Sequence, residues 1–155
     1  MSIERDLKQE QVIHLDLSAY LMVERSTPVR EVIARMREKR CGCVLVVDKG
    51  RLAGIFTERD VLCKCVDAPE TWVRPVEQLM TPNPCVIRPE DRVSTALQFM
   101  NQGHYRNTPV VDAEGKVVGN LTHYAIIDFL CDRFPEGIYN LPPDPEQVAR
   151  TRDGA

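Results

Sequence analysis

The sequence predicts an α/β protein of two β-α-β-β-α units that pack sheet to sheet about a pseudo-twofold axis. Three observations lead to this prediction. The chain repeats itself, each copy alternates helical and strand patterns in the same order, and each copy is too small to bury its sheet well alone. Residues from 12 onward align with residues from 76 onward at a constant offset of 64, which one inserted residue changes to 65.

The aligned positions share residue type and predict where the units begin and end. They include Val12/Val76, Leu15/Leu79, Val29/Val93, Met36/Met100, Val46/Val110, Gly54/Gly119 and Thr57/Thr122. We divide the chain into an N-terminal extension (1–11), unit 1 (12–66), a linker (67–75), unit 2 (76–132) and a proline-rich C-terminal tail (133–155). The prolines predict an extended or disordered tail.

The first helix of each unit is predicted from apolar residues at helical spacing. In unit 1 the pattern starts at Pro28, and proline suits a first helical turn. In unit 2 the pattern stops at Gly103, where glycine fits a helix end. The periodic residues are Val29, Val32, Ile33 and Met36 in unit 1, and Val93, Ala96, Leu97 and Met100 in unit 2.

Two strands and a second helix follow in each unit. β-Branched runs at 43–48 and 108–112 predict buried strands. A short turn with glycine leads from each run to a second strand. The expected boundaries are Phe56 and Leu121 for the end of that strand, Thr57 and Thr122 for the start of the second helix, and Val66 and Cys131 for its end.

Composition and charge argue against several classes of protein. Of the 155 residues, 43% are hydrophobic and 28% are charged, as in ordinary globular proteins. The net charge of −3 differs from the basic balance typical of nucleic-acid binders, so we expect no nucleic-acid partner. Acids stand near Met1 where a signal peptide carries positive charge, and no apolar run approaches the ~20 residues that span a bilayer. We expect a cytoplasmic protein with no membrane partner.

Six cysteines leave metal or redox sensing open as a minor alternative. They are Cys41, Cys43, Cys63, Cys65, Cys85 and Cys131. Unit 1 has two Cys-x-Cys pairs, whereas zinc sites usually place two to four residues between cysteines. Residues i and i+2 lie about 200° apart on a helix, so Cys63 and Cys65 do not easily face one ion. We expect buried, reduced thiols and no metal.

The chain offers little for catalysis, and we expect no enzyme. Its three histidines, His14, His104 and His123, are scattered. No serine or cysteine has a histidine at a recognised motif spacing, and no glycine-rich loop of the Walker type is present.

Three segments carry a resemblance to a known family. Unit 1 contains Gly-Ile-Phe-Thr-Glu-Arg-Asp at 54–60, unit 2 opens with Thr-Pro-Asn-Pro-Cys-Val at 81–86, and Tyr-Arg-Asn-Thr-Pro-Val-Val-Asp follows at 105–112. The chain thereby resembles a tandem pair of cystathionine-β-synthase (CBS) domains, the Bateman module, over about 120 residues. The resemblance implies a non-catalytic module that binds AMP, ADP, ATP or S-adenosylmethionine between its units and reports the ligand to a partner protein.

By this resemblance, Thr57 and Asp60 hold the ribose of the nucleotide. A carboxylate accepts hydrogen bonds from two vicinal hydroxyls, and a helix start offers free N–H groups and a positive dipole end. The same two residues also fit a capping box, and both roles are compatible. In unit 2, Ala125 replaces the acid and Asp128 lies one turn further on. We therefore expect one nucleotide per chain and an empty or weaker second cleft.

The resemblance places the adenine against the opening strand of unit 2. Pro84, Cys85 and Val86 are expected beside the base, with Tyr105 nearby. Small apolar groups and free backbone polar groups suit a planar heterocycle. The alternative is that Cys85 and Val86 are simply core strand residues.

Three cationic residues are candidates for the phosphates. Arg106 stands where the family often has a basic residue that faces phosphate, and a guanidinium suits phosphate oxygens. His104 lies close to it in the chain, and Arg59 of unit 1 can reach across. The alternative for Arg106 is a solvated turn before a strand.

The resemblance also implies partners. We expect a stand-alone pair that forms a homodimer through its helices, with Met36, Leu62 and Ile127 contributing, and that regulates an unidentified protein. The main alternative is an assembly module that dimerises and binds no ligand, which the missing acid at Ala125 favours.

Overall fold

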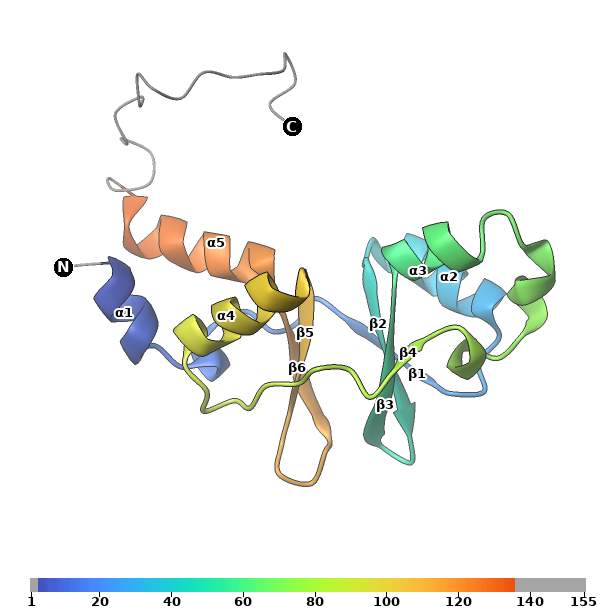
Figure 1. Cartoon of the computed structure of the whole chain (residues 1–155), viewed down its shortest axis with the longest axis horizontal. Helices are drawn as coiled ribbons and strands as arrows, with labels where there is room; N and C mark the ends of the chain where they lie inside the picture. Colours follow the sequence, from blue (N-terminus) through green and yellow to red (C-terminus); the bar gives the residue numbers. More distant parts are fainter. Residues whose placement is uncertain (1–2, 136–155) are drawn as a thin grey trace, which may run out of the picture.

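The computed structural model describes residues 3–135, so the predicted tail from residue 136 onward lies outside the described residues. Two β-sheets face each other in the middle of the protein, and helices cover the outer side of each sheet (Figure 1). The first sheet has the strand order β1-β2-β3-β4, and the second is the hairpin β5-β6. The predicted α/β architecture of two units packed sheet to sheet is confirmed.

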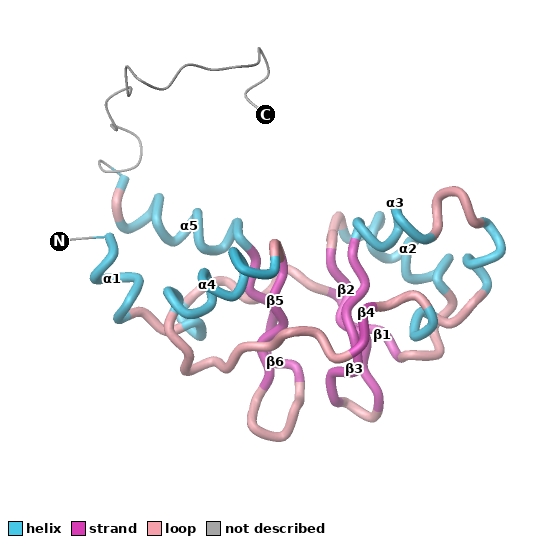
Figure 2. Tube along the Cα trace, viewed as in Figure 1, coloured by secondary structure: helices cyan, strands magenta, loops and turns pink. Residues whose placement is uncertain are grey.

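The elements follow the same order in both units (Figure 2). The strands are β1 (Leu21–Glu24), β2 (Cys43–Asp48), β3 (Arg51–Thr57), β4 (Thr81–Pro82), β5 (Asn107–Val111) and β6 (Val117–Thr122). The α-helices are α1 (Ile3–Gln9), α2 (Val29–Lys39), α3 (Glu58–Lys64), α4 (Val93–Gly103) and α5 (His123–Arg133). Short 3₁₀ helices are η1 (Val12–His14), η2 (Pro69–Val73) and η3 (Val76–Gln78).

The helix ends differ slightly from the sequence prediction. Pro28 is the N-cap of α2 in an extended conformation rather than part of the first turn. Helix α4 ends at Gly103 as predicted, but the left-handed residue that follows is His104, with φ 53°. Glycine is needed at position 103 for packing instead, because a Cβ atom there would lie 2.1 Å from the Tyr105 ring. Helix α3 ends before Val66, since a turn begins at Cys65.

The opening strand of unit 2 is shorter than the prediction. In unit 1 this strand is β1, which pairs with β2 in parallel over four residues. In unit 2 only the single bridge between Ile87 and Val110 remains. Pro84 and Pro89 flank this bridge, and proline cannot donate a ladder hydrogen bond. The prolines explain why the repeat keeps its position here but loses its strand.

Each repeat contributes its first residues to the core of the other repeat. Val12 and Leu15 pack into the second core with residues such as Val110, whereas Val76 and Leu79 pack into the first core. Backbone hydrogen bonds repeat the exchange, from Val12 N to Asp91 O at 2.9 Å and from Val76 N to Thr27 O at 2.8 Å. The packing units are therefore composites of both sequence repeats.

A third apolar cluster joins the two sheets. It contains buried residues of β2 and β3, with Val117 of β6 packed against them. Leu52 N also donates to Gly115 O at 3.0 Å, between the two hairpin turns. The buried members are Cys43, Leu45 and Ile55.

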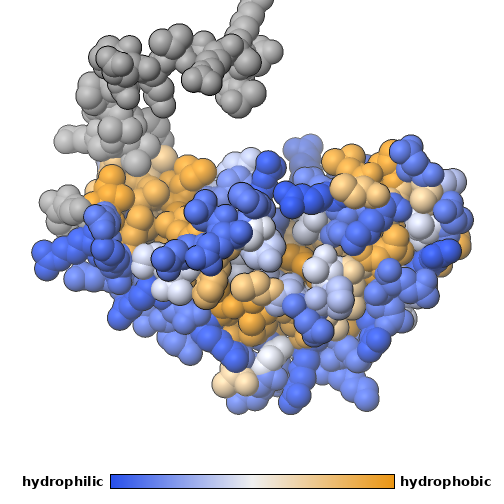
Figure 3. All heavy atoms as spheres, in the orientation of Figure 1, coloured by the Kyte–Doolittle hydropathy of each residue, from blue (hydrophilic) through white to orange (hydrophobic). Residues whose placement is uncertain are grey.

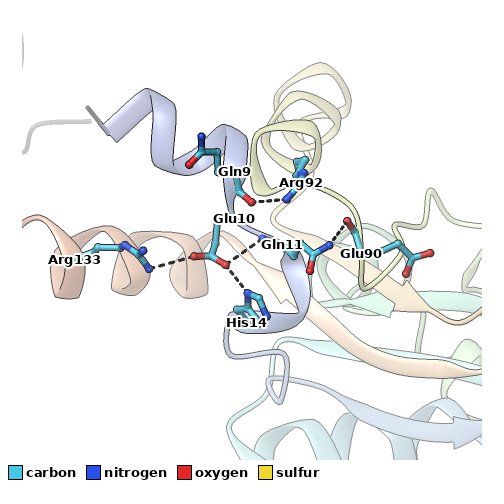
Figure 4. A network of polar contacts seen from close by, with 7 residues as sticks. All are labelled: Gln9, Glu10, Gln11, His14, Glu90, Arg92 and Arg133. Carbon is cyan, nitrogen blue, oxygen red and sulfur yellow. Dashed lines mark hydrogen bonds and ion pairs between the residues drawn. The ribbon is translucent and has the colours of Figure 1, made fainter. Parts of the chain in front are cut away.

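A polar network fastens the N-terminal extension to unit 2 (Figure 4). Glu10 lies 2.5 Å from His14 Nδ1 and 3.2 Å from Arg133 Nη1 of α5. Arg92, the N-cap of α4, donates to the backbone carbonyl of Gln9. The extension is thus a docked part of the second unit.

We expect Glu10→Gln to lower stability by about 0.5–1 kcal/mol at pH 7, because its two partners, His14 and Arg133, are each more than half exposed. The hydrogen bond to His14, with smaller contributions from Gln11 N–H and the charges of His14 and Arg133, lowers the pKa of Glu10 against the opposing effect of burial. A carboxyl group whose folded pKa is depressed stabilises above its unfolded pKa and loses that contribution as the pH falls through the folded pKa. Urea unfolding at pH 7 and pH 3 should show a smaller difference between wild type and variant at pH 3 than at pH 7. An equal difference at both values would contradict the charge-based explanation.

Candidate functional site

The junction of β3 and α3 holds the predicted ribose-binding pair. Thr57 is the N-cap of α3, and Asp60 is the third helical residue. Asp60 Oδ2 accepts hydrogen bonds from Thr57 N at 2.9 Å and from Thr57 Oγ1 at 3.2 Å. The capping interpretation is confirmed, and it orients a carboxylate that is only 9% exposed beside the start of a helix.

Asp60 has a third partner that the sequence prediction missed. Lys64 Nζ lies 2.6 Å from Asp60 Oδ1 and also donates to Leu79 O at 2.6 Å. The available signal was the spacing of four residues, which brings an acid and a lysine together on a helix. The carbonyl partner could not be found in this way, because Leu79 belongs to the other repeat.

The alternation of side chains along β3 places Thr57 on the face of the sheet that is directed toward the second unit. Side chains two residues apart on a strand share a face, so Thr57 lies on the same face as Ile55. Ile55 belongs to the cluster between the sheets and pairs with Thr81 of β4. Thr57 pairs with Cys43 of β2, which is in the same cluster. The junction therefore opens on the space between the two sheets.

The segment predicted to line the base crosses from one sheet to the other. Thr81 and Pro82 pair with β3 of unit 1, whereas Ile87 pairs with β5 of unit 2, and the connecting loop runs between them (Figure 2). Cys85 and Val86 are exposed on this crossing. The alternative that these two are core strand residues is therefore wrong.

Pro84 and Tyr105 come from different elements of unit 2. Pro84 is half-buried on the crossing segment, next to exposed Cys85. Tyr105 is 47% exposed in the turn before β5, with its ring against Gly103. Tyr105 thus presents apolar surface to solvent, and Pro84 does so in part.

The three candidate phosphate cations are all exposed. Arg59 is the second residue of α3, and His104 and Arg106 lie in the turn before β5. Among residues 3–135, none of these three side chains makes a hydrogen bond or ion pair, so all three are free for another partner. The start of α3 and the turn before β5 lie at the same edge of the two sheets (Figure 1). The approach of Arg106 to the Asp60 carboxylate stays a prediction.

The equivalent junction of unit 2 lacks the acid and its lysine. Thr122 caps α5 by accepting from Ala125 N at 3.1 Å. Ala125 stands at the position of Asp60, and Phe129 stands at the position of Lys64. Both belong to the second apolar core or pack against it. The two junctions share a cap but differ in charge.

The cysteines agree only in part with the prediction of buried thiols. Cys43 and Cys65 are each 1% exposed, and burial raises the pKa of Cys43 well above its usual range. Cys63 and Cys85 are exposed. The part of the chain that the structure describes contains no group of three or more His, Cys, Asp or Glu side chains placed to hold a metal.

Fold and site together define a class of protein, a paired α/β module with a related strand-to-helix junction in each unit. The family model described as CBS domain matches residues 12–67 and 76–132. The chain belongs to the CBS-domain family. Proteins with paired CBS domains are generally regulatory, non-catalytic modules.

Curated relatives extend beyond the matched region. The chain is 32% identical over 119 residues to CBS domain-containing protein CBSCBSPB3 of Arabidopsis thaliana, covering 72% of this chain and 21% of that protein. It is 35% identical over 102 residues to the meiotically up-regulated gene 70 protein of Schizosaccharomyces pombe, covering 65% of this chain and 14% of that protein. The chain thus spans about a fifth or less of these two relatives.

Solved structures share the fold. CBSX2 in complex with AMP superposes with a TM-score of 0.72 at 26% identity, over 79% of this chain and 97% of that chain. The cytosolic domain of the Mg²⁺ channel MgtE in complex with ATP gives a TM-score of 0.67 at 25% identity, over 79% of this chain and 49% of that chain. Within residues 3–135, no helix has the length and apolar character needed to cross a membrane.

Proposed function

We propose that this chain is a regulatory module that binds one adenine nucleotide between its units and signals occupancy to a partner protein. The observation that carries the proposal is the buried carboxylate of Asp60 at the start of α3, which is bonded to Thr57 at the end of β3. The AMP complex of CBSX2 and the ATP complex of the MgtE domain support an adenine nucleotide as the ligand class.

The remaining contacts come from both units. The exposed apolar surface of the crossing segment supports it as the base wall, and the free cations support phosphate binding. The proposed base contacts are Pro84, Cys85, Val86 and Tyr105, and the proposed phosphate contacts are Arg106, His104 and Arg59. Because both units supply contacts, the ligand favours one relative orientation of the units, which a partner can recognise.

The test is a thermal-shift series on the reduced protein with AMP, ADP, ATP and S-adenosylmethionine, and with GMP as control. A ligand at about 100 times its Kd adds about 2.7 kcal/mol, which raises the Tm of a chain this long by roughly 5–10 °C. We expect this rise with at least one adenosine ligand and none with GMP. No rise with any of them would contradict the proposal and favour an assembly module.

Assembly through helices is the second candidate function, and exposed apolar residues favour it. Helices α3 and α5 lie along the same edge of the protein, and Figure 3 shows hydrophobic surface over both (Figures 1 and 3). Leu62 is 70% exposed on α3, and Ile127 is 48% exposed on α5. Met36, in contrast, is 6% exposed in the first core, so its expected role in a dimer contact is wrong.

We expect Leu62→Asp to convert a homodimer into a monomer, because it places a charge in an apolar contact. Light scattering after size-exclusion chromatography measures the mass. Ala34→Asp, on the exposed side of α2, is the matched control and should remain dimeric. A monomeric wild type, or a dimeric Leu62→Asp variant, would contradict assembly through this surface.

A further inference from the structure

Lys64 joins two parts of the proposed site that come from different repeats. Its ammonium contacts the carboxylate of Asp60 and the carbonyl oxygen of Leu79, each at 2.6 Å. Asp60 lies on α3 of unit 1, whereas Leu79 follows η3 in the segment that unit 2 contributes to the first core. One charged group therefore connects the proposed ribose acid with the exchanged segment.

The exchanged segment leads directly to the proposed base wall. After Leu79 the chain forms β4, which pairs with Gly54 and Ile55 of β3. It then continues through Pro84–Val86 toward unit 2. Because Leu79 directly precedes this segment, its position determines where the base wall begins relative to the Asp60 carboxylate.

The charges explain why this connection is strong. A buried carboxylate needs compensation, and Thr57 occupies only the Oδ2 side of Asp60. Lys64 supplies the opposite charge at Oδ1 while its side chain stays 40% exposed. An ammonium has three donors, so it can serve the carboxylate and the Leu79 carbonyl together.

Unit 2 provides an internal comparison. Ala125 and Phe129 occupy the positions of Asp60 and Lys64, and Leu15 occupies the position of Leu79. All three are apolar, and they belong to the second core or pack against it. The lysine and the acid thus occur together in unit 1, and unit 2 has neither at the equivalent positions.

We propose that Lys64 is a positioning residue of the nucleotide site, which holds the ribose acid and the base-wall segment at the separation that adenosine requires. This inference rests on the proposed function. It adds a residue that need not touch the ligand, and it makes the docking of the exchanged segment depend on the same charge that orients Asp60.

Titration calorimetry with AMP tests the inference on the full chain. Lys64→Met keeps the length of the side chain and removes its charge, and we expect the Kd to rise about tenfold. Lys64→Arg keeps a positive charge that can donate to both the Asp60 carboxylate and the Leu79 carbonyl, so its Kd should stay within about twofold of the wild-type value. Lys39→Met, an exposed lysine on α2, is the matched control and should bind as wild type. Lys64→Met with wild-type affinity would overturn the inference.

Two further measurements separate positioning from general destabilisation. Wild type should prefer AMP to 2′-deoxyadenosine monophosphate, and Lys64→Met should reduce this preference, because a displaced carboxylate no longer fits the diol. Without ligand, hydrogen exchange at the amides of Val76, Leu79 and Met80 should accelerate in Lys64→Met and stay slow in Lys64→Arg. Absence of AMP binding in wild type would contradict the proposed function, whereas unchanged exchange in Lys64→Met would contradict the connection made by Lys64.

Discussion

Asp60→Ala is expected to abolish the rise in Tm that an adenosine ligand produces, which is roughly 5–10 °C for wild type at saturation. The carboxylate is the acceptor proposed for both ribose hydroxyls, and alanine leaves none. The substitution also removes the bond to the N-cap residue, which costs about 1 kcal/mol of stability, so the variant melts lower without ligand. The informative quantity is therefore the shift on adding ligand at each protein's own Tm.

Two variants keep this prediction interpretable. Asp60→Asn retains an oxygen that can accept from Thr57 N, so it preserves the cap while removing the charge. Asp128→Ala removes an exposed acid from the equivalent helix α5 and should keep the full ligand shift. If Asp60→Ala and Asp60→Asn both responded to AMP as wild type does, the proposed role of Asp60 would be wrong.

A fragment cut at the boundaries of the sequence repeat is expected to remain unfolded. The fragment 12–66 lacks Val76 and Leu79, which complete the first core at 0% and 8% exposure. The fragment 20–83 contains every residue of that core, including the partly buried Met80, and also carries β4. We therefore expect cooperative thermal unfolding from 20–83 and none from 12–66, measured by circular dichroism.

This comparison isolates the effect of the exchanged segment, because the two fragments are of similar size. Both contain β1, α2, β2, β3 and α3, so their local helix and strand preferences are the same. They differ in the exchanged segment, and burial of apolar side chains at about 25 cal/mol per Å² dominates the stability of a small unit. Cooperative unfolding of 12–66 alone would contradict the exchange as the basis of the core.

Much of the fold follows from patterns along the chain. The spacing of Val29, Val32 and Met36 predicts one buried helix face, and all three are buried in the first core. The β-branched run at 43–48 predicts a buried strand, and β2 has those bounds. These predictions succeed because helical and strand periodicity depend on local geometry.

The candidate site was predictable as residues and not as contacts. The spacing of Thr57 and Asp60 sufficed for the cap and for the orientation of the carboxylate, because both residues lie within one helical turn. The exposure of Cys85 and the bond from Lys64 to Leu79 were not predictable, since each depends on how distant segments pack.

The amino-acid sequence alone determines the duplicated pattern, the order of helices and strands, and the acid that only one repeat has. It does not determine which core each repeat completes. A hydrophobic residue such as Val76 signals that it will be buried, but the burial of apolar surface has no direction and does not specify its partner. Packing in three dimensions assigned Val76 to the first core and thereby brought Leu79 to Lys64.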